Sequence, residues 1–225
     1  NAITISSSSI TMGKNTAYGD TTMIAGSSAA RLGSFVLSTG ATEGVNVNTI
    51  SVTLSANEAA TITDLMLKDS ATGAQIGTTK PTPASGASGN SYSVNLNIPA
   101  SGTKTVDVYG SIKSSSNIGP IAMEIDGSGT GSNTGSSVTF GSATTGTLQT
   151  ITVSTAALTA AVGVSPYNAN VIAGSSLVKV GSFDFTSRYS YWNVDKIKVT
   201  VPNNAATSVA SVVLRYPDAS GVSTD

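Results

Sequence analysis

The sequence predicts an all-β fold, built as two-layered sandwiches that repeat along the chain. Three observations predict it: short runs in which apolar and polar residues alternate, turn residues between those runs, and internal similarity at a fixed spacing. Helical periodicity is absent. The alanines between Ser55 and Asp69 suggest a turn that leads into a strand rather than a helix.

Alternation places apolar side chains on one face of a strand and polar ones on the other. Residues 45–54 alternate in this way, with one interruption between Val47 and Ile50 that predicts a bulge. Shorter alternating runs follow at 93–98, 106–108 and 196–201. Strands that each bury one face favour a sandwich of two sheets.

Glycine, proline and asparagine separate the runs and predict turns. The expected turns lie at Thr72-Gly73, 81–90, Pro99–Gly102, Gly127–Gly135 and Pro202–Asn204. Strands therefore recur at short intervals along the whole chain.

Internal similarity gives the domain organisation. Ile3-Thr4-Ile5-Ser6 recurs as Ile151-Thr152-Val153-Ser154, and Ile24–Ser28 recurs as Ile172–Ser176, each 148 positions later. The same spacing maps Leu32–Phe35 onto Val180–Phe183. After a one-residue slip, residues 47–54 match 194–201, and residues 65–68 match 212–215.

A repeat of about 148 residues is long enough for a domain with its own core. We therefore expect a first module over residues 1–148 and the first half of a second, homologous module over residues 149–225.

Composition narrows the function. The chain has 225 residues, 39% of them hydrophobic, but only 10% charged, and its net charge is −1. Its 11 Lys and Arg residues are scattered, which argues against a nucleic-acid partner. No run of 18 apolar residues occurs, so we expect no insertion into a membrane.

The residue types that most catalytic sites need are missing. The chain has no His and no Cys, which removes the commonest general base, the usual nucleophile–base pairs, zinc ligands and disulfides. We therefore expect no enzyme activity and assign no catalytic residue.

Calcium is the one cofactor that the sequence leaves open, because it needs only oxygen ligands. Glu124 and Asp126 share a face of a strand, and Asp126 precedes a glycine-rich stretch that resembles a turn. That stretch lacks the acidic residues of a calcium-binding loop. An exposed strand face is the simpler interpretation.

An aromatic segment distinguishes the two modules. Where the first has residues 39–44, the second has Ser187–Trp192, which introduces Arg188, Tyr189, Tyr191 and Trp192. Aromatic and arginine side chains are enriched at protein contacts, and aromatic rings can also stack on sugars. Three interpretations stay open: packing at a domain junction or core edge, a subunit contact, and a glycan site.

The chain resembles the tandem immunoglobulin-like repeats of large bacterial surface proteins, including S-layer-like proteins. The resemblance covers nearly the whole chain; its carriers are 98–106, 151–158 and 171–185. It implies immunoglobulin-like sandwich modules, with Pro99 and Gly102 setting a hairpin or corner that opens a strand of the second sheet. It also implies a prokaryotic cell-surface or extracellular location and a mechanical or adhesive role.

A half module has a physical consequence. It exposes an apolar face and unpaired strand edges, so either more chain or another copy of the protein must cover them. Donor-strand complementation would do so, with Ile3, Ile5 and Ile10 in an exchanged strand over residues 1–12. The alternative is that residues 1–12 form the first strand of their own domain.

These observations predict a structural protein that joins further copies of itself in a surface layer, sheath or filament. The alternative is an adhesin or a glycan-binding surface module.

Overall fold

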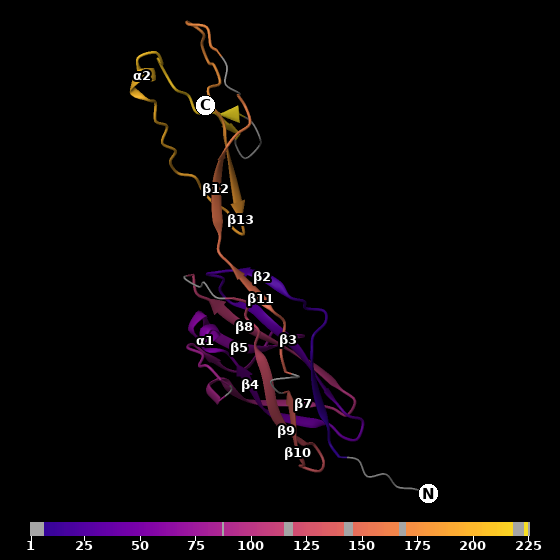
Figure 1. Cartoon of the computed structure of the whole chain (residues 1–225). Helices are drawn as coiled ribbons and strands as arrows, with labels where there is room; N and C mark the ends of the chain where they lie inside the picture. Colours follow the sequence, from indigo (N-terminus) through magenta and orange to yellow (C-terminus); the bar gives the residue numbers. More distant parts are fainter. Residues whose placement is uncertain are drawn as a thin grey trace. The chain divides into compact units, whose positions relative to one another are not determined.

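The computed structural model describes residues 7–86, 88–114, 119–141, 146–166, 170–217 and 223–224. Over these residues the protein is almost entirely β, as predicted (Figure 1). It divides into two units, Asn1–Tyr191 and Trp192–Asp225. The first unit holds a complete two-sheet sandwich.

One sheet of the sandwich has five antiparallel strands in the order β1-β3-β8-β5-β6. The strands are β1 (Ile10–Lys14), β3 (Ala30–Thr39), β8 (Thr103–Ile112), β5 (Ile62–Asp69) and β6 (Gln75–Lys80).

The second sheet has four antiparallel strands in the order β10-β9-β4-β7. They are β10 (Ser137–Gly141), β9 (Glu124–Gly131), β4 (Val45–Thr53) and β7 (Ser91–Ile98). With β6 and β7 as insertions, the two orders are those of an immunoglobulin-like sandwich.

Local sequence signals explain much of this topology. The register of β4 shifts between Val47 and Thr49 against both of its neighbours, so the predicted bulge is confirmed. The turn at Pro99–Gly102, closed by a hydrogen bond from the Gly102 amide to the Pro99 carbonyl (2.9 Å), carries the chain from β7 in one sheet to β8 in the other. The predicted corner is therefore confirmed as well.

The core lies between the sheets and is built from the apolar faces of both. Its largest fully buried side chains include Tyr92, Phe35, Leu32, Ile50 and Leu65. Every buried core residue lies between Ile10 and Ile151. The remaining described residues add none.

The segment after β4 corrects one prediction. Residues Ala56–Thr61 form a short helix, α1, instead of a turn. Ser55 caps it: the Glu58 amide donates to the Ser55 hydroxyl (3.3 Å), and the Ser55 amide donates to the Glu58 carboxylate (2.7 Å). This capping box supplies the stability that helical periodicity does not.

The glycine-rich stretch corrects a second prediction, that of a turn at Gly127–Gly135. Gly127–Gly131 belongs to strand β9, within the four-stranded sheet, and the turn begins only after Gly131. A Cβ on Gly127 would overlap the Phe140 ring and the Thr49 carbonyl oxygen. These glycines are needed because neighbouring strands and side chains approach the β9 backbone closely.

Beyond the two sheets, β2 (Thr21–Ile24) pairs in parallel with β11 (Ile151–Ser154), and Figure 1 shows the two side by side. Ile151 is fully buried in the core of the first sandwich. We expected the second module to begin near residue 149, but the structure places residues 151–154 in the first sandwich.

The chain then forms an antiparallel pair, β12 (Ala157–Val162) and β13 (Phe183–Arg188). Leu158 pairs with Ser187 and Val162 with Phe183. In the first sandwich, Ile10 pairs with Thr39 and Lys14 with Phe35. Each residue of the later pair lies 148 positions beyond its counterpart, so both pairs have the same register.

Backbone details recur at the same spacing. Gly26 and Gly174 have φ angles of 93° and 88°, and Ala29 and Leu177 have 47° and 53°. The Ser27 amide donates to Ile24 (3.1 Å), as the Ser175 amide donates to Ile172 (3.2 Å). Residues 171–177 therefore repeat the backbone conformation that follows β2.

The second unit holds little regular structure. It contains helix α2 (Asn203–Ala206) and the short pair β14 (Tyr216–Pro217) and β15 (Ser223–Thr224). The strand predicted at 196–201 is not formed. Its counterpart β4 is paired on both sides, with β7 and β9.

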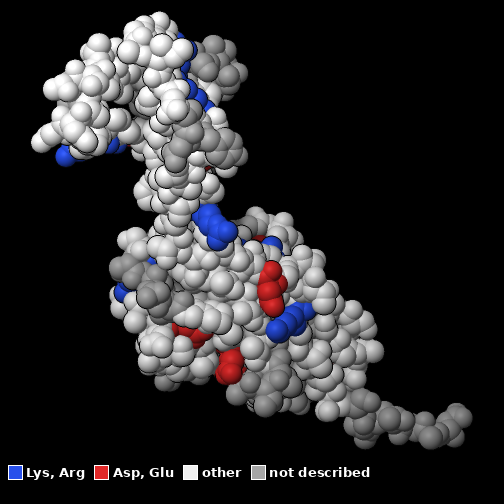
Figure 2. Space-filling view, turned by 45° about the horizontal axis from the view of Figure 1, so that its top comes forward, with Lys and Arg blue, Asp and Glu red and all other residues white. Residues whose placement is uncertain are grey.

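The visible surface carries few charges. Figure 2 shows Lys, Arg, Asp and Glu scattered singly or in small groups among uncharged residues, with no single-sign patch on that face. Among the described residues, no helix is long and apolar enough to cross a membrane.

Candidate functional site at the junction between the modules

The strongest candidate site is the segment that closes the first sandwich, residues 146–154, which we call the junction segment. On one side β11 pairs with β2; the Ala25 amide donates to Ser154 (2.9 Å). On the other side Ile151 and Ile121 exchange two backbone hydrogen bonds, each of 2.8 Å. The junction segment is therefore inserted between two parts of the first sandwich.

Leu148 and Gln149 fix the start of β11. Leu148 is fully buried and lies against Gly33, where an added Cβ would come within 2.6 Å of it. The Gln149 side chain accepts a hydrogen bond from the Ser34 amide (2.8 Å) and donates one to the Ser34 carbonyl (3.0 Å). Its carboxamide thus pairs with the β3 backbone as a neighbouring strand would.

A polar cluster extends from Ser34 into the five-stranded sheet. Asp107, which is buried, accepts hydrogen bonds from the Ser34 hydroxyl (2.7 Å) and the Arg31 guanidinium (2.6 Å). The guanidinium lies 4.2 Å from the centre of the Tyr18 ring. Burial raises the pKa of the Tyr18 hydroxyl, and the Arg31 charge opposes that rise. The cluster therefore links β3 to β8 and to the segment before β2.

A second network holds the chain just before β1. The carboxylate of Glu43 accepts hydrogen bonds from the Ser8 hydroxyl and the Thr134 hydroxyl, and from the amides of Asn133 and Thr134. These bonds, that from Ser8 first, lower the pKa of Glu43 to about 2. The network fixes residue 8 to the turn between β9 and β10.

The predicted donor residues fall into two groups. Ile3 and Ile5 lie outside the described residues. Ile10 begins β1, pairs with Thr39 and is buried. Ile10 is therefore a core residue of its own sandwich and not a donor residue, because a strand that is already paired on its own core cannot also complete a neighbour.

The structure places the aromatic segment on the surface. Arg188 ends β13, and Tyr189 has a positive φ angle of 63°. Tyr191, the last residue of the first unit, is fully exposed, and Trp192, the first residue of the second unit, is 47% exposed.

The calcium candidates both lie on strand β9. Glu124 and Asp126 are partly buried at the start of β9, where Glu124 pairs with Thr53 and Asp126 with Ser51. Burial raises the pKa of the Asp126 carboxyl, and a hydrogen bond from Ser51 opposes that rise. Within the described ranges, no three acidic side chains gather where they could hold a metal ion.

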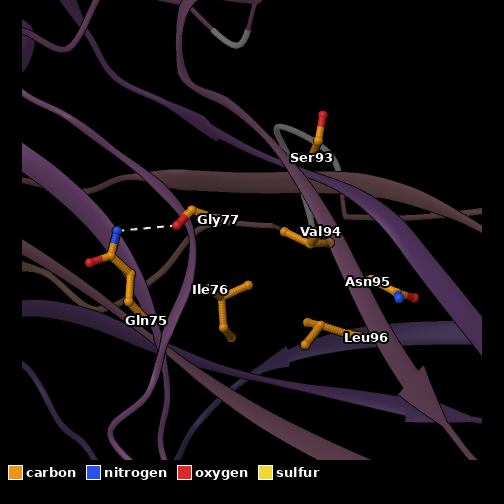
Figure 3. A pocket seen from close by; sticks show the side chains of 7 residues that line it. All are labelled: Gln75, Ile76, Gly77, Ser93, Val94, Asn95 and Leu96. Atoms are coloured by element: carbon orange, nitrogen blue, oxygen red, sulfur yellow. Dashed lines mark hydrogen bonds between the residues drawn. The ribbon is translucent and has the colours of Figure 1, made fainter.

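A shallow groove of about 430 Å³ opens between the edge strands β6 and β7. Figure 3 shows its lining, in which the Gln75 carboxamide donates to the Gly77 carbonyl (3.1 Å) beside Ile76, Val94 and Leu96. No charged side chain lines it. Its polar side chains are those of Gln75, Ser93 and Asn95.

Sequence reasoning missed Gln149 and Glu43. Gln149 aligns with Asn1, a second carboxamide at the head of the repeated Ile-Thr-Ile/Val-Ser, and this signal was available in the sequence. No sequence signal marked Glu43, because the four groups that donate hydrogen bonds to its carboxylate belong to residues far away in the sequence.

Comparisons with known proteins add little. No family model and no curated protein matches the chain. One matching solved structure is a family 123 glycoside hydrolase from Clostridium perfringens, described in work on glycolipid glycan hydrolysis. It is 15% identical with a TM-score of 0.30, over 60% of this chain and 27% of the hydrolase chain. The match therefore spans about a quarter of that enzyme, and a likeness this slight carries no argument about activity.

Proposed function

We infer that the protein is a non-catalytic structural component of the prokaryotic cell surface or extracellular space, which assembles with further copies of itself through β-sandwich modules. The product would be a surface layer, a sheath or a filament. One observation carries this proposal: the large apolar side chains of the second module are exposed, whereas their counterparts in the first sandwich are buried.

The contrast is clear at individual positions. Phe183 is 41% and Phe185 42% exposed, while their counterparts Phe35 and Leu37 are fully buried. Ile197 is 37% exposed, and its counterpart Ile50 is fully buried. Every large apolar side chain found exposed among the described residues lies between Val162 and Tyr216.

Such a surface favours association. Burying one large apolar side chain contributes about 1.5–3 kcal/mol, and exposed apolar surface on this scale marks contact sites. Phe183 and Phe185 already pack edge to face, with ring centres 5.4 Å apart. Strand β13 therefore presents a packed pair of apolar side chains that another molecule of this chain can cover.

Composition supports the remaining parts of the proposal. Without His or Cys, the chain lacks the groups most enzymes use, and its low charge and lack of disulfides suit a sandwich stabilised by packing and strand pairing.

Electron microscopy of the purified chain tests the proposal. We expect ordered sheets or filaments, and we expect Phe185→Asp to abolish them, because a charge on the apolar face must be desolvated on contact. A matched control, Thr186→Asp, changes the neighbouring residue on the other strand face and should assemble normally. A chain that remains strictly monomeric under all assembly conditions would refute the proposal.

The exposed aromatic residues favour a second candidate, an adhesin or glycan-binding module. Tyr189, Tyr191 and Trp192 would then stack on sugar rings. A glycan array distinguishes the two candidates: binding that disappears in Trp192→Ala but persists in Val194→Ala would favour the adhesin. Absence of binding would favour the structural role.

A further inference from the structure

We propose that residues 1–6 of one molecule occupy, in the second module of another molecule, the position that residues 149–154 occupy in the first sandwich. The inference rests on the proposed self-assembly and names its contact. The occupant is a second molecule of this chain, joined by a strand that is parallel to the segment around Val171 and Ile172.

In the first sandwich this position is occupied. It is taken by the junction segment, whose Ile151 is fully buried and whose Gln149 pairs with the backbone of Ser34. Met23 and Ile24 on β2 are partly covered there. The filled position thus combines a parallel strand, an apolar anchor and a carboxamide.

In the second module the corresponding position is uncovered. A Cβ on Gly181 would meet nothing within 4 Å, whereas its counterpart Gly33 is in contact with Leu148. Val171 and Ile172, the counterparts of Met23 and Ile24, are 55% and 83% exposed. The backbone around them already has the conformation seen after β2.

Sequence similarity identifies the occupant. Residues 1–6 are Asn-Ala-Ile-Thr-Ile-Ser, and residues 149–154 are Gln-Thr-Ile-Thr-Val-Ser. Both segments begin with a carboxamide, have β-branched apolar residues at their third and fifth positions, and carry no charge. Gln149 is recognised by the backbone amide and carbonyl of Ser34, and the backbone of Ser182, the counterpart of Ser34, offers the same two groups.

The geometry of this contact sets the form of the assembly. Each molecule would donate its first residues and receive those of another molecule at its second module. Such a head-to-tail contact uses two different surfaces and does not close by twofold symmetry, so it generates rings or open fibres. Backbone hydrogen bonds would give affinity, and the positions of residues 3 and 5 would give specificity.

Disulfide cross-linking tests the contact directly, because the chain has no cysteine of its own. In the first sandwich Thr152 lies opposite Thr22, and the counterparts of these residues are Thr4 and Asn170. We would mix a Thr4→Cys protein with a size-tagged Asn170→Cys protein and oxidise the mixture. Neighbouring strands hold opposed Cα atoms within the range that a disulfide spans.

We expect a mixed dimer at several times the yield obtained when Thr4→Cys is mixed with Ile172→Cys. That control shifts the thiol two residues along the same strand, which carries the opposed Cα atoms beyond about 7 Å. A chain carrying both Thr22→Cys and Thr152→Cys should close within itself and serves as the positive reference.

The outcomes separate the two proposals. Sheets or filaments without a cross-link between positions 4 and 170 would overturn this inference and leave self-assembly standing. A cross-link of equal yield at 170 and 172 would also overturn it, because the register would then be absent. Neither assembly nor cross-link would overturn both.

Discussion

At the scale of single residues, buried polar side chains hold distant parts of the chain together, as disulfides do in many extracellular proteins. Glu43, Asp107 and Gln149 are each buried, and each accepts hydrogen bonds from residues far away in the sequence. A buried carboxylate or carboxamide is tolerated only when its partners are in place. These residues therefore fix the relative positions of strands that a purely apolar core would leave free to slide.

Glu43 makes stability depend on pH. Its folded-state pKa of about 2 lies below its ordinary value near 4.5, so its contribution is present above pH 4.5 and is lost as the pH falls towards 2. We expect Glu43→Gln to lower the melting temperature at pH 7, and we expect the gap from the unmodified chain to narrow below pH 4.5. Circular dichroism melts between pH 2 and 7 measure it. A gap that is independent of pH would contradict this role.

Gly127 tests the close packing of β9. Its replacement by alanine should destabilise the protein by about 1–3 kcal/mol, because the new methyl group would overlap the Phe140 ring and the Thr49 carbonyl oxygen. Gly13→Ala is the matched control, since a Cβ there meets nothing within 4 Å. Urea unfolding compares the two, and equal effects would show that β9 has room for a side chain.

At the scale of elements, the junction segment matters most. The sequence assigns its residues 149–154 to the second module, yet Ile151 lies in the core of the first. A strand whose hydrogen bonds lie on both sides, to β2 and to Ile121, is coupled firmly to the first sandwich.

Ile151→Ala tests this coupling. We expect a loss of about 2–5 kcal/mol in the stability of the first sandwich, because the change leaves a cavity in a closed core. Ile172→Ala makes the same chemical change at an exposed position and should alter stability by less than about 0.5 kcal/mol. Thermal melts of the two variants compare their losses of stability. Equal, small effects would mean that the first sandwich does not depend on β11.

At the scale of the whole molecule, the sequence predicted the parts that depend on local signals. Alternation predicted the strands at 45–54, 93–98 and 106–108, the interruption near Asn48 predicted the bulge, and Pro99–Gly102 predicted the corner between sheets, whereas the strand predicted at 196–201 is not formed. The sequence predicted a turn at the glycines of β9, but they lie in a strand. Glycine is needed there because other strands and side chains approach the β9 backbone closely, and only the folded protein brings those groups together. The short helix α1 was not predicted, because its segment lacks helical periodicity and the capping box of Ser55 and Glu58 is what stabilises it.

The boundary between modules could not be placed from similarity alone. A repeat shows which residues correspond, but not which sandwich a shared strand enters. The register of β12 and β13, which matches that of β1 and β3, is a structural counterpart of the sequence repeat. Residues 149–154 could be assigned to the first sandwich only from the three-dimensional contacts of Gln149 and Ile151.

Sedimentation velocity of the unmodified chain over a wide concentration range tests the central claim, self-assembly, most directly. We predict species larger than the 22.4 kDa chain, with a mean mass that keeps rising with concentration as in head-to-tail polymerisation. A single boundary at the mass of one chain, at every concentration up to the solubility limit, would contradict the account.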